Sequence, residues 1–256
     1  MGIPDEHIHP VATGVAAETV AKHWDPQEIV FYSGWFCPFV QRTWIALEER
    51  GIPYQYVEVN PYKKEPHFLE INPKGLVPAI EYKGRALYES IILCEFLEDA
   101  FPERKPNLLP ADPSDRAYAR MWIDYVTKNL VPASMRLVQA QDPEQQKEHL
   151  KELLEFQRAF AAQVKGPYFL GEEFSLVDIT LVPWIVRDFV SAEHRGYRRE
   201  DAGEAWKKYA DNLVTRPSVI NTSSELVHYY EIVHRYLKNE SQSEMAKAVR
   251  AGRDIP

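Results

Sequence analysis

The chain has 256 residues, of which 45% are hydrophobic and 27% charged, a composition that suits a globular protein of one large domain or two modest ones. Its formal net charge is -8 and its 30 Lys and Arg are spread along the chain, which argues against a nucleic-acid partner. Two cysteines exclude a disulfide-rich secreted scaffold, and the sequence has neither a signal peptide nor about 18 consecutive apolar residues, so we expect no membrane partner and a cytoplasmic location.

The first predicted segment, residues 1–27, is an N-terminal arm. Three prolines and two glycines interrupt both helical and strand periodicity, so we expect it to be extended. A buried strand is expected over Glu28 to Ser33, a short run of β-branched and aromatic residues. A helix follows: Pro38 suits its first turn, and Gly51 marks its end.

Five more elements complete the first half of the chain. We expect a strand over Tyr54 to Asn60, a short helix over His67 to Asn72, and a hairpin of the strands Leu76 to Tyr82 and Arg85 to Tyr88. A helix then follows up to Phe101, because apolar residues recur at helical spacing. The order β-α-β-α-β-β-α predicts an α/β domain over residues 28–101.

The second half of the chain differs in kind. Residues 102–113 hold four prolines and are the natural linker. Helical patterns then cover 114–137, 144–164, 176–194 and 202–213, without a convincing strand between them, so we expect an all-helical domain over residues 114–238. The polar C-terminal tail, residues 239–256, is either a frayed helix or disordered.

Cys37 is the first candidate for chemistry. It lies between the end of a predicted strand and Pro38 at the start of a helix, where unpaired backbone donors and the helix dipole favour an anion. Cysteines in such places have pKa values lowered from about 8.5 to about 3.5–7.5, which makes them nucleophilic at neutral pH. No second cysteine follows three residues later, so a mixed disulfide would have to be resolved by an outside thiol. The alternative is a small buried packing residue, which we expect Cys94 to be.

Two further segments could bind a ligand. The step from Val77 to Pro78 suits a cis peptide bond, which would leave the Val77 backbone open for pairing, although base rates favour trans. Glu89 and Ser90 open a predicted helix: Ser90 offers a hydroxyl and a backbone N–H to a carboxylate, and Glu89 could receive an ammonium group. Ordinary helix capping is the alternative interpretation of this pair.

These motifs together resemble a known family. The element order of the first domain resembles a thioredoxin fold, and Cys37-Pro38-Phe39, Asn72-Pro73-x-Gly75-x-Val77-Pro78 and Tyr88-Glu89-Ser90 are similar to the omega class of glutathione transferases. The stretch Phe169 to Asp178 resembles the core signature of the family's helical domain. Within it, Ser175 and Asp178 have the spacing of a capping box, for which we expect a structural role. The similarity covers residues 28–238.

The resemblance implies a ligand and a set of contacts. Glutathione would be the cosubstrate, with its cysteinyl part paired to the Val77 backbone before Pro78 and its γ-glutamyl end held by Glu89 and Ser90. Phe39 would flank the thiol of Cys37. A basic residue is expected before the short second helix, and Lys64 or its neighbour Lys63 would fill that role. A homodimer is also implied.

A second, hydrophobic site is a weaker expectation. Side chains of the first and a later helix of the helical domain could line it, although Met and aromatic residues at helical spacing also suit core packing. The candidates are Tyr118, Met121, Trp122, Tyr125, Trp184 and Arg187. The eight histidines show no metal-ligand spacing, so we expect no metal.

Three hypotheses on function follow. By resemblance, the first is a glutathione-dependent thiol transferase that removes glutathione from adducts through a mixed disulfide at Cys37, with dehydroascorbate reduction and transfer to small hydrophobic or aromatic electrophiles as further activities. Tyr32 and Ser33 lie near Cys37 in sequence, but Cys37 is the better-placed nucleophile. The second is a carrier of hydrophobic or phenolic ligands, and the third is a non-catalytic interaction module.

Overall fold

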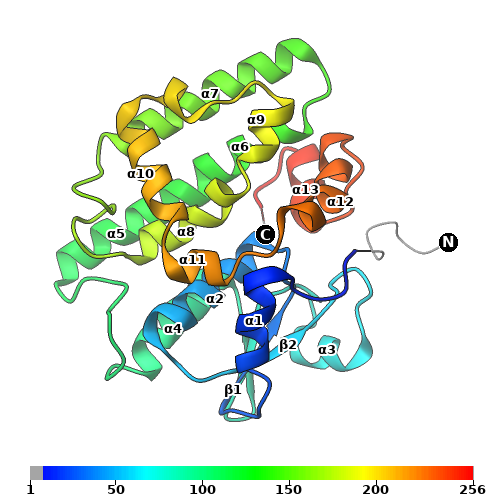
Figure 1. Cartoon of the computed structure of the whole chain (residues 1–256), viewed down its shortest axis with the longest axis vertical. Helices are drawn as coiled ribbons and strands as arrows, with labels where there is room; N and C mark the ends of the chain where they lie inside the picture. The colour runs from blue at the N-terminus through cyan, green and yellow to red at the C-terminus, as the bar shows by residue number, and fades with distance from the viewer. Residues whose placement is uncertain (1–7, 256) are drawn as a thin grey trace. The chain divides into compact units, whose positions relative to one another are not determined.

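The computed structural model describes residues 8–255 (Figure 1). The chain divides into two compact units, Met1–Leu108 with Pro217–Tyr229, and Leu109–Arg216 with Tyr230–Pro256. The main division falls inside the stretch predicted as a linker. An α/β unit followed by a helical one confirms the expected fold class.

A four-stranded sheet in the order β2-β1-β3-β4 forms the centre of the first unit. The central strand β1 (Ile29–Ser33) pairs in parallel with β2 (Gln55–Glu58) and antiparallel with β3 (Ala79–Tyr82), which forms a hairpin with β4 (Arg85–Tyr88). Consecutive residues of β1 are buried, so both faces of the strand are covered; it therefore carries a run of apolar residues, with Phe31 fully buried. All four strands were predicted.

Helices α2 (Pro38–Arg50) and α4 (Ser90–Ala100) pack against each other, and α4 also contacts β3 and β4. Pro38 opens α2 as expected, and Gly51 ends it in the left-handed conformation with φ 55°. The short α3 (Pro66–Ile71) buries Phe68. These helices confirm the predicted element order.

The N-terminal arm differs from its prediction. Gly14–Lys22 forms helix α1, which buries Ala16 and Thr19, so the expectation of an extended arm is wrong for these residues. Helix α1 contacts α11 (Pro217–Asn221), and Figure 1 shows the two lying close together. Short helices stabilised by such distant partners carry little local signal. Residues 1–7 of the predicted arm lie outside the described part of the chain.

Segment 217–229 was assigned to the helical domain but packs on the first unit. Gln41 of α2 donates to the Ser223 hydroxyl at 2.9 Å and to the Thr222 carbonyl at 3.3 Å. The Ser218 hydroxyl donates to the Glu49 carboxylate at the other end of α2. The first unit is therefore completed by residues more than 100 positions from its sheet.

The second unit is helical, as predicted, and within residues 109–255 the one pairing of strand type is the isolated bridge between Tyr168 and Gly171. None of the helices formed by residues 8–255 is both long and apolar enough to cross a bilayer. The helical segments of the second unit are α5 (Pro113–Tyr125), η2 (Val126–Leu130), α6 (Val131–Gln139), α7 (Pro143–Ala161), α8 (Leu176–Val186), α9 (Phe189–His194), η3 (Arg199–Ala202), α10 (Glu204–Val214) and α13 (Glu244–Arg250). Helix α12 (Leu226–Leu237) spans the division between the units.

The start of α8 carries the predicted capping box. The fully buried Asp178 carboxylate accepts hydrogen bonds from the Ser175 backbone N–H at 2.8 Å, the Phe169 N–H at 2.8 Å and the Tyr209 hydroxyl at 2.7 Å. The Ser175 hydroxyl donates to it as well, at 2.6 Å. One side chain thus joins α8, the preceding turn and α10, which confirms the expected structural role.

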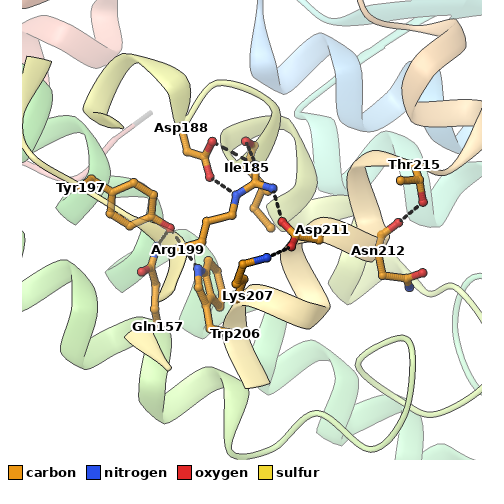
Figure 2. A network of polar contacts seen from close by, with 10 residues as sticks. All are labelled: Gln157, Ile185, Asp188, Tyr197, Arg199, Trp206, Lys207, Asp211, Asn212 and Thr215. Carbon is orange, nitrogen blue, oxygen red and sulfur yellow. Dashed lines mark hydrogen bonds and ion pairs between the residues drawn. The ribbon is translucent and has the colours of Figure 1, made fainter. Parts of the chain in front are cut away.

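An ion-pair network follows the end of α8 (Figure 2). Arg199 in η3 donates to both carboxylate oxygens of Asp188, at 2.6 and 3.0 Å, and to Asp211 of α10 at 2.8 Å. It also donates to the carbonyl oxygen of Ile185 at 3.2 Å. Burial raises the pKa of Asp188, while the Arg199 guanidinium opposes that shift. The network fixes the chain that follows α8 against α10.

The described part of the tail packs as a helix rather than remaining disordered. Helix α13 is capped by the Ser243 hydroxyl, which accepts the Ala246 N–H at 3.0 Å, and it buries Met245, Ala246 and Ala248. Burial of these apolar residues explains why a largely polar segment folds here. The last residue, Pro256, lies outside the described residues.

Candidate functional site

Cys37 lies at the N-terminal end of α2, as its sequence position predicted. Its N–H donates to the Gly34 carbonyl at 2.8 Å, which closes the turn between β1 and α2, and its own carbonyl accepts the Gln41 N–H at 3.1 Å. The residue is partly exposed and forms no disulfide. The helix N-terminus directs backbone donors towards a sulfur anion here.

Val77 is the residue that the fold brings to this sulfur. The Cys37 Sγ lies 3.9 Å from the Val77 carbonyl oxygen, across 40 positions of sequence. Val77 precedes β3, its peptide bond to Pro78 is cis, and both side chains are buried. The backbone of the segment that leads into β3 therefore borders the thiol.

Ser90 and Glu89 begin α4 in the same unit. Ser90 is buried, and its hydroxyl oxygen accepts a hydrogen bond from the Arg42 guanidinium at 3.3 Å. Glu89 is exposed, pairs with Lys74 at 2.7 Å, and has φ 80° and ψ 110°. A non-glycine residue in such a region costs about 1–3 kcal/mol, and these residues cluster at ligand sites.

Arg42 is a site residue that the sequence analysis missed. Its side chain is buried, and its guanidinium lies over the Phe39 ring, 5.2 Å from the centroid. Burial lowers the pKa of Arg42 to about 9, while electrostatic attraction to an ionised Cys37 acts in the opposite direction. It remains positively charged at neutral pH and attracts a thiolate at Cys37. A buried arginine carries no sequence signal, since arginines are mostly exposed.

Lys74, in the free position of the motif Asn72-Pro73-x-Gly75, was not singled out from the sequence, and its role in the structure is the ion pair with Glu89. Lys64, by contrast, lies where the prediction requires a basic residue. A Cβ added at Gly75 would come within 3.1 Å of the Lys64 Cδ, so the Lys64 side chain covers the segment leading to Val77. Lys63 is exposed in the same loop and stays the alternative.

The other nucleophiles near β1 are engaged elsewhere. The Ser33 hydroxyl is buried and donates to the Tyr56 hydroxyl at 3.0 Å, and the Tyr32 hydroxyl donates to Glu81 at 3.4 Å. Cys94 is fully buried in α4, and burial raises its pKa to about 12, so it stays a neutral thiol. Cys94 is a packing residue, as predicted, and Cys37 is the accessible sulfur.

The predicted hydrophobic-site residues serve packing in part. The Trp122 ring contacts those of Phe160 and Phe169, with centroids 5.7 and 5.3 Å apart. Tyr118 stacks on Phe169, and Tyr125 lies 4.8 Å from Trp122. These three side chains thus belong to an aromatic cluster of the helical unit.

The remaining three candidates lie in different surroundings. Met121 is 67% exposed on α5, and Trp184 is buried within α8. Arg187 donates to the Pro183 carbonyl at 2.7 Å. A role of the six residues in a hydrophobic site stays a prediction. No group of three or more His, Cys, Asp or Glu side chains suited to a metal ion occurs in the part of the chain that the structure describes.

Comparisons with known proteins find relatives for both halves of the chain. A family model described as the N-terminal domain of glutathione S-transferase matches residues 36–100, and one described as the C-terminal domain matches residues 121–217. The chain is 34% identical over 184 residues to glutathione S-transferase omega-1 of Rattus norvegicus, which covers 68% of this chain and 76% of the relative. It is 35% identical over 158 residues to the probable glutathione S-transferase parC of Nicotiana tabacum, which covers 61% and 71%.

Solved structures extend the similarity to the fold. The crystal structure of glutathione transferase Omega 3C from Trametes versicolor is 64% identical, with a TM-score of 0.87, and the match covers 91% of this chain and 100% of that one. The rice glutathione transferase GST1, solved in complex with glutathione, is 28% identical with a TM-score of 0.76, covering 85% and 100%. Both units of the chain therefore have counterparts among these proteins.

Proposed function

Because the chain belongs to the glutathione transferase family, as an omega-like member, we propose that it is a thiol transferase that uses Cys37 to remove glutathione from disulfide adducts. The observation that carries this proposal is the placement of Cys37, the one partly exposed cysteine, at the N-terminus of α2 and 3.9 Å from the Val77 carbonyl. A cysteine in this position favours thiol exchange, whereas a serine or tyrosine would favour conjugation.

The reaction proceeds in two exchanges. The Cys37 thiolate attacks the glutathione sulfur of an adduct, the Cys37–glutathione disulfide forms, and the substrate leaves as a thiolate that takes up a proton. A second glutathione thiolate then attacks the glutathione sulfur of this mixed disulfide, which yields oxidised glutathione and restores the Cys37 thiolate. The neutral, buried Cys94 cannot act as a resolving thiol, so the second glutathione is required.

The first unit supplies the glutathione contacts in this proposal. The Val77 backbone pairs with the cysteinyl part, Glu89 receives the γ-glutamyl ammonium, and Ser90 binds the γ-glutamyl carboxylate. Lys64 offers a positive charge to the glycyl end. The glutathione complex of the rice relative supports a glutathione site in this fold.

Dehydroascorbate reduction by the same thiol and transfer of glutathione to small hydrophobic or aromatic electrophiles, in which the glutathione thiolate attacks the electrophile, are further proposed activities. A reducing compartment such as the cytoplasm suits them, because free glutathione is needed at each turnover. A homodimer is proposed from the family resemblance.

A carrier of hydrophobic ligands is the second candidate, favoured by the exposed Met121 on α5. The two candidates differ in their dependence on the thiol. We expect Cys37→Ser to lose thiol transfer from a glutathione–cysteine mixed disulfide by at least about 100-fold, because the hydroxyl cannot form the intermediate. Binding to immobilised glutathione should persist. Unchanged turnover in Cys37→Ser would contradict the proposal. If the wild-type protein does not bind immobilised glutathione, that result would favour a non-catalytic module.

A further inference from the structure

Glu58, at the carboxyl end of β2, is a point of convergence for hydrogen bonds near the thiol. Its Oε1 accepts the backbone N–H of Trp35 at 2.9 Å, and its Oε2 accepts the Tyr56 hydroxyl at 2.8 Å. The Ala12 backbone N–H is a third donor, from the N-terminal arm. Tyr56 in turn accepts the Ser33 hydroxyl at 3.0 Å. The carboxylate thus joins the arm, β2 and the loop after β1.

Trp35, two residues before Cys37, is the part of this loop that Glu58 holds. Its side chain is 1% exposed, and its indole N–H donates to the His9 carbonyl of the arm at 2.8 Å. Its ring packs edge-on against Phe36 and Tyr229, with centroids 5.7 and 5.1 Å apart. The same turn ends where the Cys37 N–H meets the Gly34 carbonyl, so a shift of the Trp35 amide displaces the sulfur.

The groups around Glu58 are donors without a full positive charge at neutral pH. Among the ion pairs formed by residues 8–255, none includes Glu58. Besides Tyr56, the titratable side chains around Trp35 are Tyr229 and the imidazoles of His9 and His228, which lie 6.3 and 6.5 Å from the indole ring. Burial raises the pKa of Glu58 to about 7, although the three hydrogen bonds oppose the shift.

Protonation changes what this carboxyl group can hold. An ionised carboxylate accepts from all three donors, whereas a carboxylic acid must donate its own proton. Among the side chains that contact the carboxylate, the Tyr56 oxygen can accept this proton, which requires the Ser33–Tyr56–Glu58 chain of hydrogen bonds to reverse. The three hydrogen-bond donors therefore favour the ionised form of Glu58, whereas its burial disfavours that form.

We propose that Glu58 is a positioning residue for the thiol reaction: its ionised carboxylate holds the Trp35 amide and, through the loop of residues 34–36, sets the position of Cys37. This proposal assigns Glu58 no contact with glutathione. Its kinetic consequence rests on the proposed function, but its structural part does not, so the two can fail separately.

The structural part is tested by NMR of protein with ¹⁵N-labelled tryptophan in a Cys37→Ser background, which removes titration of the thiol. The Trp35 amide proton, assigned with Trp35→Phe, should shift with a midpoint near pH 7. With Glu58→Gln added, that transition should disappear, although His9 and His228 are still present. A transition that persists in the double variant, or an amide that does not titrate in the single variant, would overturn the proposal.

The kinetic part uses the rate at which Cys37 reacts with iodoacetamide, which needs no bound glutathione. At pH 8 we expect Glu58→Ala to change this rate and to lower thiol transfer about tenfold, since a small displacement of a reacting group has such effects. Glu58→Gln, which keeps an acceptor for the Trp35 N–H, should recover most of the transfer. Equal rates of transfer in wild type and both variants would contradict the proposal.

Glu98→Gln is the matched control. Glu98 is a buried carboxylate of the same unit, paired with Arg50 at 2.6 Å, so its replacement tests loss of stability without touching the loop. We expect transfer within about twofold of wild type for this variant. An equally large loss of thiol transfer in Glu98→Gln would show that Glu58 acts only through the stability of the fold, which would overturn the proposal. If Glu58→Ala does not fold, the NMR titration of Glu58→Gln decides.

Discussion

Glu89 and Lys74 form an exposed ion pair at the start of α4, and only one of them is proposed to bind the ligand. We expect Glu89→Gln to raise the dissociation constant of glutathione about tenfold, because the ligand's ammonium loses a charged acceptor. Calorimetry in a Cys37→Ser background measures binding without turnover. Lys74→Ala removes the ion pair but keeps the carboxylate, and should change affinity much less. Weaker binding in Lys74→Ala than in Glu89→Gln would contradict the assignment of the ammonium contact to Glu89.

Through Glu58, the free energy of unfolding should depend on pH. Its pKa is raised from 4.5 to about 7 in the folded protein, so the unfolded chain releases this proton at lower pH than the folded one. The contribution of Glu58 to the free energy of unfolding should fall as pH rises from about 4.5 to about 7, and stay constant above. Urea unfolding should show a smaller difference in the free energy of unfolding between pH 5 and pH 8 for Glu58→Gln than for wild type. Equal differences would contradict the assignment.

The position of a candidate site residue could be predicted from the sequence where the neighbouring strand end and helix start determine it. The placement of Cys37 beside Pro38 followed from a strand end and a helix start, and the fold confirmed it. Arg42 and Glu58 could not be predicted, because their partners are Ser90 and Trp35, which only the tertiary structure brings near. The cis form of Val77–Pro78 was likewise open, since base rates favour trans.

At the scale of elements, Asp178 is the side chain on which α8 depends. We expect Asp178→Ala to lower the free energy of unfolding by about 3–5 kcal/mol, because it leaves the buried Phe169 N–H and Tyr209 hydroxyl without an acceptor. Ser175→Ala removes one capping hydroxyl and should cost about 1 kcal/mol. Denaturant unfolding of both variants measures the two values. Similar losses would show that the capping box, rather than the links to the preceding turn and α10, is what matters.

Elements with a strong local pattern were predicted, and those that depend on distant contacts were not. Strand β1 and helix α2 have apolar runs bounded by Gly34, Pro38 and Gly51. Helix α1 is short and lacks a side-chain N-cap hydrogen bond, and its contact is with α11, about 200 positions away. Its helical state is stabilised by packing, which periodicity within 27 residues could not reveal.

At the scale of the whole molecule, the family resemblance predicts a homodimer. Sedimentation should give a single species of twice the chain mass of 29.7 kDa at micromolar concentration. A single species of 29.7 kDa at micromolar concentration would contradict this prediction without affecting the proposed chemistry of Cys37. The proline-rich stretch 102–113 was predicted to be the linker, but the return of segment 217–229 to the first unit was not expected, because Gln41 and Ser223 form their hydrogen bond without a sequence signature.

The central claim is that a single sulfur, that of Cys37, exchanges with glutathione, and intact mass after treatment with oxidised glutathione tests it most directly. Wild type should gain one glutathionyl group, reversible by reduced glutathione, and Cys37→Ser should gain none, because the Cys94 thiol is buried and neutral. Equal labelling of both proteins would assign the reactivity to Cys94, and an unlabelled wild type would leave the proposed mixed disulfide without support; either result would contradict the account.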